Sequence, residues 1–414
     1  MKKRISIAVA ALWCCSTGAG AQVSQAEWEQ FKAQFAAMSD RVSALEAENK
    51  RLRSQGQVSV EDLAATNAEV ASLNKRHKAS SWAENTRWQG DFLYRYEEIQ
   101  QQGRSDQDRN RVRARAALVA NLPDDIEVGL GMATGGDSPV STMQTLGGGG
   151  STKELRLDLA YAKWNPRQNL SLIGGKFKNP FFKPQNSGLI WDGDFRPEGA
   201  AMTWLGDTFF ATAEGNLLAS DTDNDDEISW GVMGGTRFNL GSARLIAALQ
   251  YLRFPVKGLQ AIIDDQFFGN SSEIVNGTEV YKYDYNLYNA GLELSLQLFD
   301  TPVTLYGDFV RNEDADDLDT GYLFGVKVGK IGAGGSWQFG YQYEDLEADA
   351  ALGLLSDSNF AGGGTDGKGH TFTGKYALNR RWALGLTYYD NTRGVDLGSD
   401  SDYKRVMLDT AFKY

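Results

Sequence analysis

The stretch Arg109-Asn-Arg-Val-Arg-Ala-Arg-Ala-Ala-Leu-Val-Ala-Asn121 decides the fold. From Arg109 to Arg115 every second position carries arginine, and the positions from Val112 to Ala120 between and beyond them carry small or apolar side chains, which is the period of a β-strand. An arginine on the lipid face of a barrel costs about 2–4 kcal/mol near the bilayer midplane, so we expect the arginines to face water in a lumen. The expected lumen set is Arg109, Arg111, Arg113 and Arg115, and the expected outer set is Val112, Ala114, Ala116, Leu118 and Ala120.

The same alternation continues to the end of the chain and predicts sixteen strands. They are 87–97, 109–121, 125–134, 153–164, 169–177, 199–206, 208–217, 227–238, 243–254, 286–298, 303–312, 320–330, 335–344, 369–379, 381–390 and 402–414. Short turns alternate with long polar loops, and this asymmetry is typical of a bacterial outer-membrane barrel. The sequence therefore predicts an all-β, antiparallel transmembrane β-barrel of about sixteen strands over residues 87–414. A soluble β-sandwich or propeller is the alternative that single strands cannot exclude.

The first residues predict export. A cationic start at Met1–Arg4, an apolar run at Ile5–Trp13 and the small residues Ala19–Ala21 form a secretory signal, with cleavage expected before Gln22. Cleavage would remove both cysteines and three cations, which changes the formal charge from −12 to −15. So acidic a chain is not expected to bind nucleic acid. No later run of 18 apolar residues exists, so a membrane-spanning form is expected to be a closed barrel.

A coiled coil is expected ahead of the barrel, in the periplasm, over residues 22–75. Its seam alternates spacings of three and four without a slip: Trp28, Phe31, Phe35, Met38, Val42, Leu45, Asn49 and Leu52. Asn49 occupies an a position, where a buried amide fixes register and oligomer number. A single amphipathic helix on a surface is the alternative. A second short helix is expected from the capping box at Ser59 and Asp62, followed by a polar linker over 76–86.

The last strand carries the most specific signal. Val406, Leu408, Thr410, Phe412 and Tyr414 alternate outward, and Arg405, Asp409 and Lys413 occupy the inward positions. A final strand of this form resembles the signal that the outer-membrane assembly machinery reads. Its terminal tyrosine also suits the aromatic girdle of a barrel.

A family resemblance rests on the segment GKFKNPFFKPQNSGLIWDGDFRPEGAA at Gly175–Ala201. Its NPF at Asn179–Phe181 and its WDGDFRPEG at Trp191–Gly199 resemble the loop region of the Gram-negative putative porin family, similar in style to the phosphate-selective porins. The arginine-rich strand supports the resemblance, which covers roughly residues 80–414. It implies a sixteen-stranded, trimeric pore, and it says little about the solute.

Loop 178–198 is the candidate constriction of such a pore, because it combines aromatic residues with both signs of charge. We expect cations at Lys176, Lys178 and Lys183 to be set against acids at Asp192, Asp194 and Glu198. Facing rows of opposite charge would create a transverse field and set ion preference. An ordinary surface loop is the alternative. Further candidate lumen residues are Glu154, Arg156 and Asp158, and these charges are as well suited to pairing with one another as to selecting a solute.

The sequence thus predicts a passive porin for small hydrophilic solutes in the outer membrane of a Gram-negative bacterium. The alternatives are an anion or phosphate channel that uses the arginine row, and a tether that links the outer membrane to the cell wall through the coiled coil. No enzyme is expected, because neither His77 nor His370 has a paired nucleophile, and no cofactor or metal site is expected. The expected partners are further copies in a homotrimer, outer-membrane lipid and lipopolysaccharide, the assembly machinery and small solutes.

Overall fold

The computed structural model describes residues 25–55, 65–72, 85–220 and 227–414. The chain divides into two units, residues 1–80 and residues 81–414. The expected signal at 1–21, the capping box at Ser59 and most of the expected linker lie outside the described residues.

The first unit holds helix α1 (Gln25–Gln55) and a short helical stretch over 65–72. The side chains of Trp28 and Phe31 lie outside the described part of the chain. The other six residues of the expected seam are exposed on α1: Phe35, Met38, Val42, Leu45, Asn49 and Leu52. Their role in self-association stays a prediction. None of the described helices is both long enough and apolar enough to cross a membrane.

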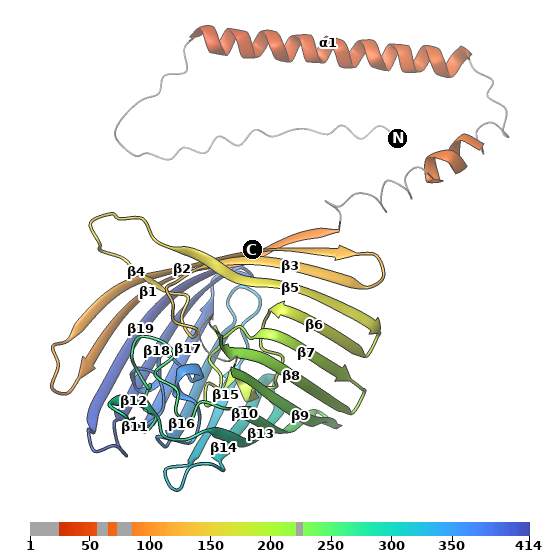
Figure 1. Ribbon diagram of the computed structural model, residues 1–414. Helices are drawn as coiled ribbons and strands as arrows, with labels where there is room; N and C mark the ends of the chain where they lie inside the picture. Colours follow the sequence, from red (N-terminus) through yellow and green to blue (C-terminus); the bar gives the residue numbers. More distant parts are fainter. Residues whose placement is uncertain (1–24, 56–64, 73–84, 221–226) are drawn as a thin grey trace. The chain divides into compact units, whose positions relative to one another are not determined.

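The second unit is a closed antiparallel barrel (Figure 1). Its wall is made of β1 (Thr86–Gln101), β2 (Gln107–Leu122), β3 (Ile126–Thr134), β5 (Leu155–Arg167), β6 (Leu170–Lys176), β7 (Glu198–Leu205), β8 (Phe209–Ala219), β9 (Glu227–Leu240), β10 (Ala243–Phe254), β13 (Tyr285–Leu298), β14 (Thr301–Asn312), β15 (Thr320–Gly329), β16 (Trp337–Leu346), β17 (Gly367–Ala377), β18 (Trp382–Arg393) and β19 (Ser401–Lys413). The sheet closes because β1 pairs with β2 on one side and with β19 on the other. All sixteen predicted strands are confirmed, with ends that differ by no more than four residues.

Three further short strands were not expected from the sequence. The two-residue strand β4 (Gln144–Thr145) pairs with β2 at Arg111, beyond the point where β3 leaves it. Residues 135–143 therefore leave the wall after β3, and the chain then pairs with β2 again through β4. The other two strands, β11 (Ser272–Val275) and β12 (Thr278–Tyr281), form a hairpin of their own within the loop over 255–284.

The side chains of the wall alternate as the period of two requires. On β19, Met407 is 3% exposed while Leu408 is 48% exposed, so odd positions face inward and even positions face outward. The outward aromatic residues pack on one another. The ring of Trp382 stacks on Phe412 at 4.9 Å, and its indole nitrogen donates a hydrogen bond of 2.7 Å to the hydroxyl of Thr410. The outward parity expected for the final strand is confirmed at these positions.

Three long loops fill one side of the lumen: 177–197, 255–284 and 347–366. The inner faces of β10 and β13–β16 carry large apolar side chains, which pack against side chains of the loops. The wall contributes Leu252, Phe254, Tyr285, Leu287, Val310, Leu323 and Leu346, and the loops contribute Phe181, Leu189, Ile190, Trp191, Phe195, Ala350, Leu352 and Leu355 to a single buried cluster. The burial of this apolar surface holds the loops inside the barrel. The open part of the lumen consequently lies beside β1, β2 and β19.

Candidate functional site: the constriction of the barrel lumen

Loop 177–197 begins and ends at neighbouring strands but reaches across the lumen. Lys176 and Glu198 lie opposite each other on β6 and β7. The backbone amide of Gln185 donates a hydrogen bond of 3.1 Å to Glu293 on β13, and its carbonyl oxygen accepts one of 2.8 Å from Lys327 on β15. Five wall strands separate β7 from β15. The loop therefore folds into the lumen and is not a surface loop.

Stacked aromatic rings fix the path of this loop. The indole of Trp191 lies between the rings of Phe181 and Phe195, at centroid distances of 6.0 and 5.3 Å, and meets Phe254 of β10 edge-on at 5.5 Å. Trp191 is only 3% exposed. Offset stacks of this kind stabilise beyond the area they bury. The aromatic residues that made the loop recognisable in the sequence thus hold it in place.

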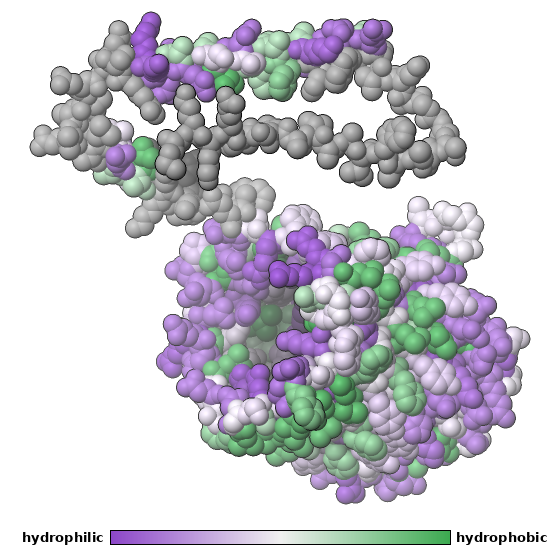
Figure 2. Space-filling view, turned by 180° about the vertical axis from the view of Figure 1, so that it is seen from behind, coloured by the Kyte–Doolittle hydropathy of each residue, from purple (hydrophilic) through white to green (hydrophobic). Residues whose placement is uncertain are grey.

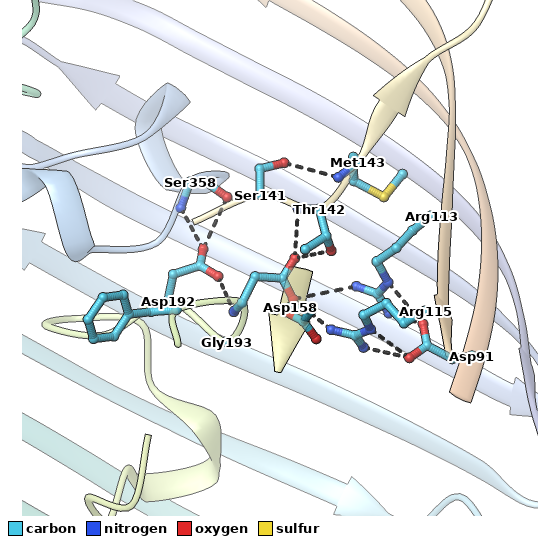
Figure 3. Close-up of polar contacts among 12 residues, drawn as sticks. Asp91, Arg113, Arg115, Ser141, Thr142, Met143, Asp158, Asp192, Gly193 and Ser358 are labelled. Carbon is cyan, nitrogen blue, oxygen red and sulfur yellow. Dashed lines mark hydrogen bonds and ion pairs between the residues drawn. The ribbon is translucent and has the colours of Figure 1, made fainter. Parts of the chain in front are cut away.

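The far side of the loop is joined to the arginine row of β2 (Figure 3). One carboxylate oxygen of Asp194 lies 2.9 Å from Arg115 and 3.9 Å from Arg113. Both guanidinium groups also pair with Asp91 of β1, at 2.7 and 2.8 Å. The other oxygen of Asp194 accepts hydrogen bonds from the hydroxyl and the amide of Thr142, at 2.8 and 3.1 Å. Asp194 therefore connects the loop, the wall and the inward excursion at 135–143.

The arginine row continues toward the long-loop end of the barrel. Glu97 of β1 is fully buried and has three partners: Arg109 at 2.8 Å, Arg111 at 3.6 Å and Arg405 of β19 at 3.1 Å. Arg95 forms a separate pair with Asp409, at 2.7 Å. In all, the six arginines 95, 109, 111, 113, 115 and 405 face the four acids Asp91, Glu97, Asp194 and Asp409. This wall of the lumen therefore keeps an excess of positive charge.

A second carboxylate of the loop faces other loop residues. Asp192 accepts hydrogen bonds of 3.0 Å from both the amide and the hydroxyl of Ser358, which belongs to loop 347–366. Burial, and then the neighbouring Asp357, raise the pKa of Asp192 to about 7. Burial alone would also raise the pKa of Asp194, but Arg113 and Arg115 outweigh it and hold that pKa below its usual value. Adjacent carboxyl groups of one loop thus have opposite pKa shifts.

The lysines of the loop do not face acids across the pore as the sequence led us to expect. Lys176 pairs with Glu198 at 2.5 Å, on the neighbouring strand at the base of the loop. The ammonium of Lys183 donates to the carbonyl oxygens of Trp191 and Asp192, at 3.4 and 3.3 Å. Burial lowers the pKa of Lys183 and also that of Lys178. The cationic row beside the constriction is therefore made by arginines of β2, and these lysines do not belong to it.

The remaining candidates of the sequence lie together beside the constriction. Arg156 pairs with Glu154 and Asp137 near the long-loop end of β5. Asp158 is the extra residue of a β-bulge in β5. Its carboxylate pairs with Arg196 of the loop at 3.3 Å. The sequence placed Arg405 and Asp409 at inward positions of the last strand without assigning them to the site. Arg196 and the wall residues Asp91, Arg95 and Glu97 were not among the expected site residues. The wall residues could have been found, since they stand at alternate positions of the first and last strands.

Adjoining cavities lie on the open side of the lumen. A cavity of about 220 Å³ lies at the constriction, between Arg95 and Arg113 on one side and Asp192 and Asp357 on the other. A second cavity of about 400 Å³ adjoins it and shares the lining residues Val140, Ser141, Ser358 and Asn359. Figure 2 shows the barrel unit hollowed, with hydrophilic residues around much of the rim. Charges of opposite sign across a narrow aqueous gap are the arrangement that sets ion preference in channels.

The comparison with protein families accounts for most of the chain. A family model described as Putative porin matches residues 50–215 and 263–409. The chain belongs to the Putative porin family. Its barrel and its family fit an outer-membrane channel. No curated protein sequence matches the chain.

Solved structures with the same architecture are distant in sequence from this family member. OprB of Pseudomonas putida, solved at high pH, is 12% identical and has a TM-score of 0.57, with 85% of this chain and 97% of that chain covered. OmpF of Salmonella typhi, in complex with daunomycin, is 12% identical and has a TM-score of 0.48, with 80% and 99% covered. OmpT of Vibrio cholerae, in a trimer form, is 13% identical and has a TM-score of 0.48, with 80% and 99% covered. At such identity the match to OprB shows the shared barrel fold.

Proposed function

We propose that this chain is an outer-membrane porin through which small hydrophilic solutes and ions diffuse passively. The observation that carries the proposal is the position of Asp194, which lies on a loop from β6 and β7 and pairs inside the lumen with Arg115 of β2. A loop held across a closed barrel narrows the lumen without abolishing it, because polar cavities remain on its open side. The even strand number and the alternation of turns and loops support placement in an outer membrane.

We propose an anion preference as the second step. Six arginines face four carboxylates along the open wall, so an anion gains more from the wall than a cation does. Asp192 and Asp357 oppose this from the loop side of the constriction. Because burial raises the pKa of Asp192 to about 7, its negative charge is incomplete near neutral pH.

A homotrimer is the proposed assembly, with the seam of α1 as one contact between the copies. Its side chains from Phe35 to Leu52 are exposed in the single chain, with exposed fractions of 51–67% for the five apolar ones. A helix that exposes such a seam gains stability by association. The tether hypothesis remains a separate prediction. Deleting residues 22–75 tests it: a detached envelope with intact conductance would support tethering.

The deciding experiment is single-channel recording from the purified, full-length protein in a planar bilayer under a potassium chloride gradient. The expected result is stepwise conductance in groups of three, with a reversal potential of the sign that chloride selectivity gives. A cation-selective reversal potential would refute the anion preference alone. Absence of conductance from a barrel whose folding is shown by heat-modifiable migration would refute the porin proposal.

A further inference from the structure

The cavity next to the constriction, at the long-loop end of the barrel, is lined by arginine to an unusual degree. Its volume is about 400 Å³, and five arginines line it: Arg104, Arg109, Arg111, Arg393 and Arg405. Tyr403, Ser358 and Asn359 add polar groups, and among the described residues no lysine, aspartate or glutamate lines the cavity. We propose that this cavity, the arginine vestibule, is a binding site for small solutes that carry two negative charges. The proposal deepens the porin function and rests on it for its biological meaning.

The charge balance around the vestibule is the first argument. Three of its arginines share one carboxylate, that of Glu97, which lies 2.8 Å from Arg109 and is fully buried behind them. Arg104 and Arg393 make no ion pair with any carboxylate in the part of the chain that the structure describes. Among the lining residues and their ion-pair partners, five guanidinium groups are thus matched by one carboxylate, although the whole chain carries a formal charge of −12. Like charges held together repel one another, and a bound anion relieves that repulsion.

The local backbone makes room for one of the two arginines that lack an acid. Gly362 has φ = +87°, a conformation that side chains rarely adopt. A Cβ atom at this position would lie 2.9 Å from a terminal guanidinium nitrogen of Arg393 and 3.2 Å from the ring of Tyr403. Because glycine leaves this space free, the guanidinium of Arg393 can lie beside the tyrosine ring and line the vestibule.

The size and chemistry of the vestibule define the class of solute. Its volume equals that of about a dozen water molecules at their share in the liquid, which suits a short dicarboxylate or a phosphate monoester. Guanidinium groups bind carboxylates and phosphates through paired hydrogen bonds, and such charge-assisted bonds are stronger than neutral ones. A solute with two anionic groups can engage arginines of the wall and of the rim at once. A solute with one anionic group can engage either the arginines of the wall or those of the rim, but not both at once.

The vestibule also lies where such binding affects passage. It adjoins the constriction cavity through the lining residues Val140, Ser141, Ser358 and Asn359. A bound dianion therefore stands directly before the narrow part of the lumen. Binding would enrich the solute there and reduce the current that chloride carries.

The test measures binding itself, so that it does not depend on conductance. Titration calorimetry of the full-length protein in detergent, at low salt, uses succinate, inorganic phosphate and acetate as probes. The double variant Arg104→Gln with Arg393→Gln removes two of the five arginines. The matched control is Arg311→Gln, because Arg311 pairs with Asp319 at 2.9 Å and does not line the vestibule. A barrel that still shows heat-modifiable migration confirms that each variant is folded.

The expected result is a dissociation constant for succinate or phosphate that rises at least tenfold in the double variant and stays within twofold in the control. Binding of succinate alone would assign the site to dicarboxylates, and binding of phosphate alone would assign it to phosphoryl groups. Gly362→Ala, which crowds Arg393 without a change of charge, should also weaken dianion binding. No binding of either dianion, acetate bound as tightly as succinate, or equal constants in all variants would overturn the proposal.

Bilayer recordings separate failure of this inference from failure of the porin proposal. Conductance without dianion binding would overturn the vestibule site and leave the porin function standing. Dianion binding to a folded barrel without conductance would refute the porin proposal and leave the site standing.

Discussion

Replacing Asp194 by asparagine is the sharpest test of how the constriction is held. The carboxylate lies 2.9 Å from Arg115 and 3.9 Å from Arg113, and it accepts two hydrogen bonds from Thr142. Asparagine has nearly the same shape and keeps a carbonyl oxygen that can accept the bond from the amide of Thr142. The substitution therefore removes the ion pair between loop and wall while leaving the local packing intact.

The expected cost follows from these contacts. Both arginines keep Asp91 as a partner, at 2.7 and 2.8 Å, so neither is left as a buried unpaired charge. The loss is then close to that of charged hydrogen bonds, about 2–3 kcal/mol of loop docking free energy. Such a loss shifts the docking equilibrium by a factor of about 30–150, at tenfold for each 1.4 kcal/mol. The aromatic stack at Trp191 still retains the rest of the loop.

Single-channel recording detects this change as larger, noisier conductance steps and a reversal potential moved toward that of chloride. The control is Asp137→Asn, which removes a charge from the excursion at 135–143, where the side chain is 74% exposed. Conductance and reversal potential that are the same in Asp194→Asn and in the unmodified protein would refute the reasoning.

Four further outcomes are expected. Because burial raises the pKa of Asp192 to about 7, its ionisation opposes folding, so the thermal unfolding midpoint should fall as pH rises from about 4 to 7, and Asp192→Asn should remove that part of the fall. Trp191→Ala should cost about 3–5 kcal/mol of loop docking and increase protease cleavage within 177–197. Phe412→Ser, which removes a ring stacked on an outward tryptophan, should lower the yield of heat-modifiable barrel in isolated membranes. Asn49→Leu should raise the melting temperature of the oligomer and broaden its distribution in sedimentation velocity.

Each of these outcomes has a matched control. Asp137→Asn should leave the pH dependence unchanged, because that carboxylate is largely exposed. Trp230→Ala, at an outward position of β9 that is 42% exposed, should not affect cleavage of the loop. Phe299→Ser, in a turn where the ring is 99% exposed, should not affect the barrel yield. Glu48→Leu, next to the seam but not in it, should leave the oligomer distribution narrow. A variant that behaves like the unmodified protein, or a control that shows the effect expected of its variant, would contradict the corresponding prediction.

The sequence predicted the barrel well because the two sides of its wall meet different solvents. Arg113 and Arg115 can point only toward water, and that requirement fixes the parity of every neighbour on β2. The same logic applied to the final strand, where Leu408 and Met407 lie on opposite faces as expected. Strand ends were less sharply defined, because hydrogen bonding extends β1 to Gln101, beyond the last clearly alternating residue.

The constriction was only partly predictable, because loop geometry is set by contacts between distant segments. The aromatic and charged content of loop 178–198 suggested that it folds inward, and this is what the structure shows. The alternation predicted the two neighbouring strands but not their register, and the register of β6 and β7 is what places Lys176 opposite Glu198. The excursion at 135–143 was equally hidden, because its contact with the loop runs through Asp194 and Thr142. Periodicity describes strands and has no counterpart in such loops.

The pairing of β1 with β19 also affects how quickly the protein folds. Arg95 and Asp409, which pair between these two strands, are 314 positions apart in the chain. Bringing two points so distant together costs about 5 kcal/mol of chain entropy by the logarithmic loop-closure relation, before any contact compensates for it. Non-local pairing of this kind slows folding, and until it forms, the first and last strands each expose an edge that another chain can join. The risk of aggregation is therefore concentrated in this final step, and a catalyst of assembly would be most effective there.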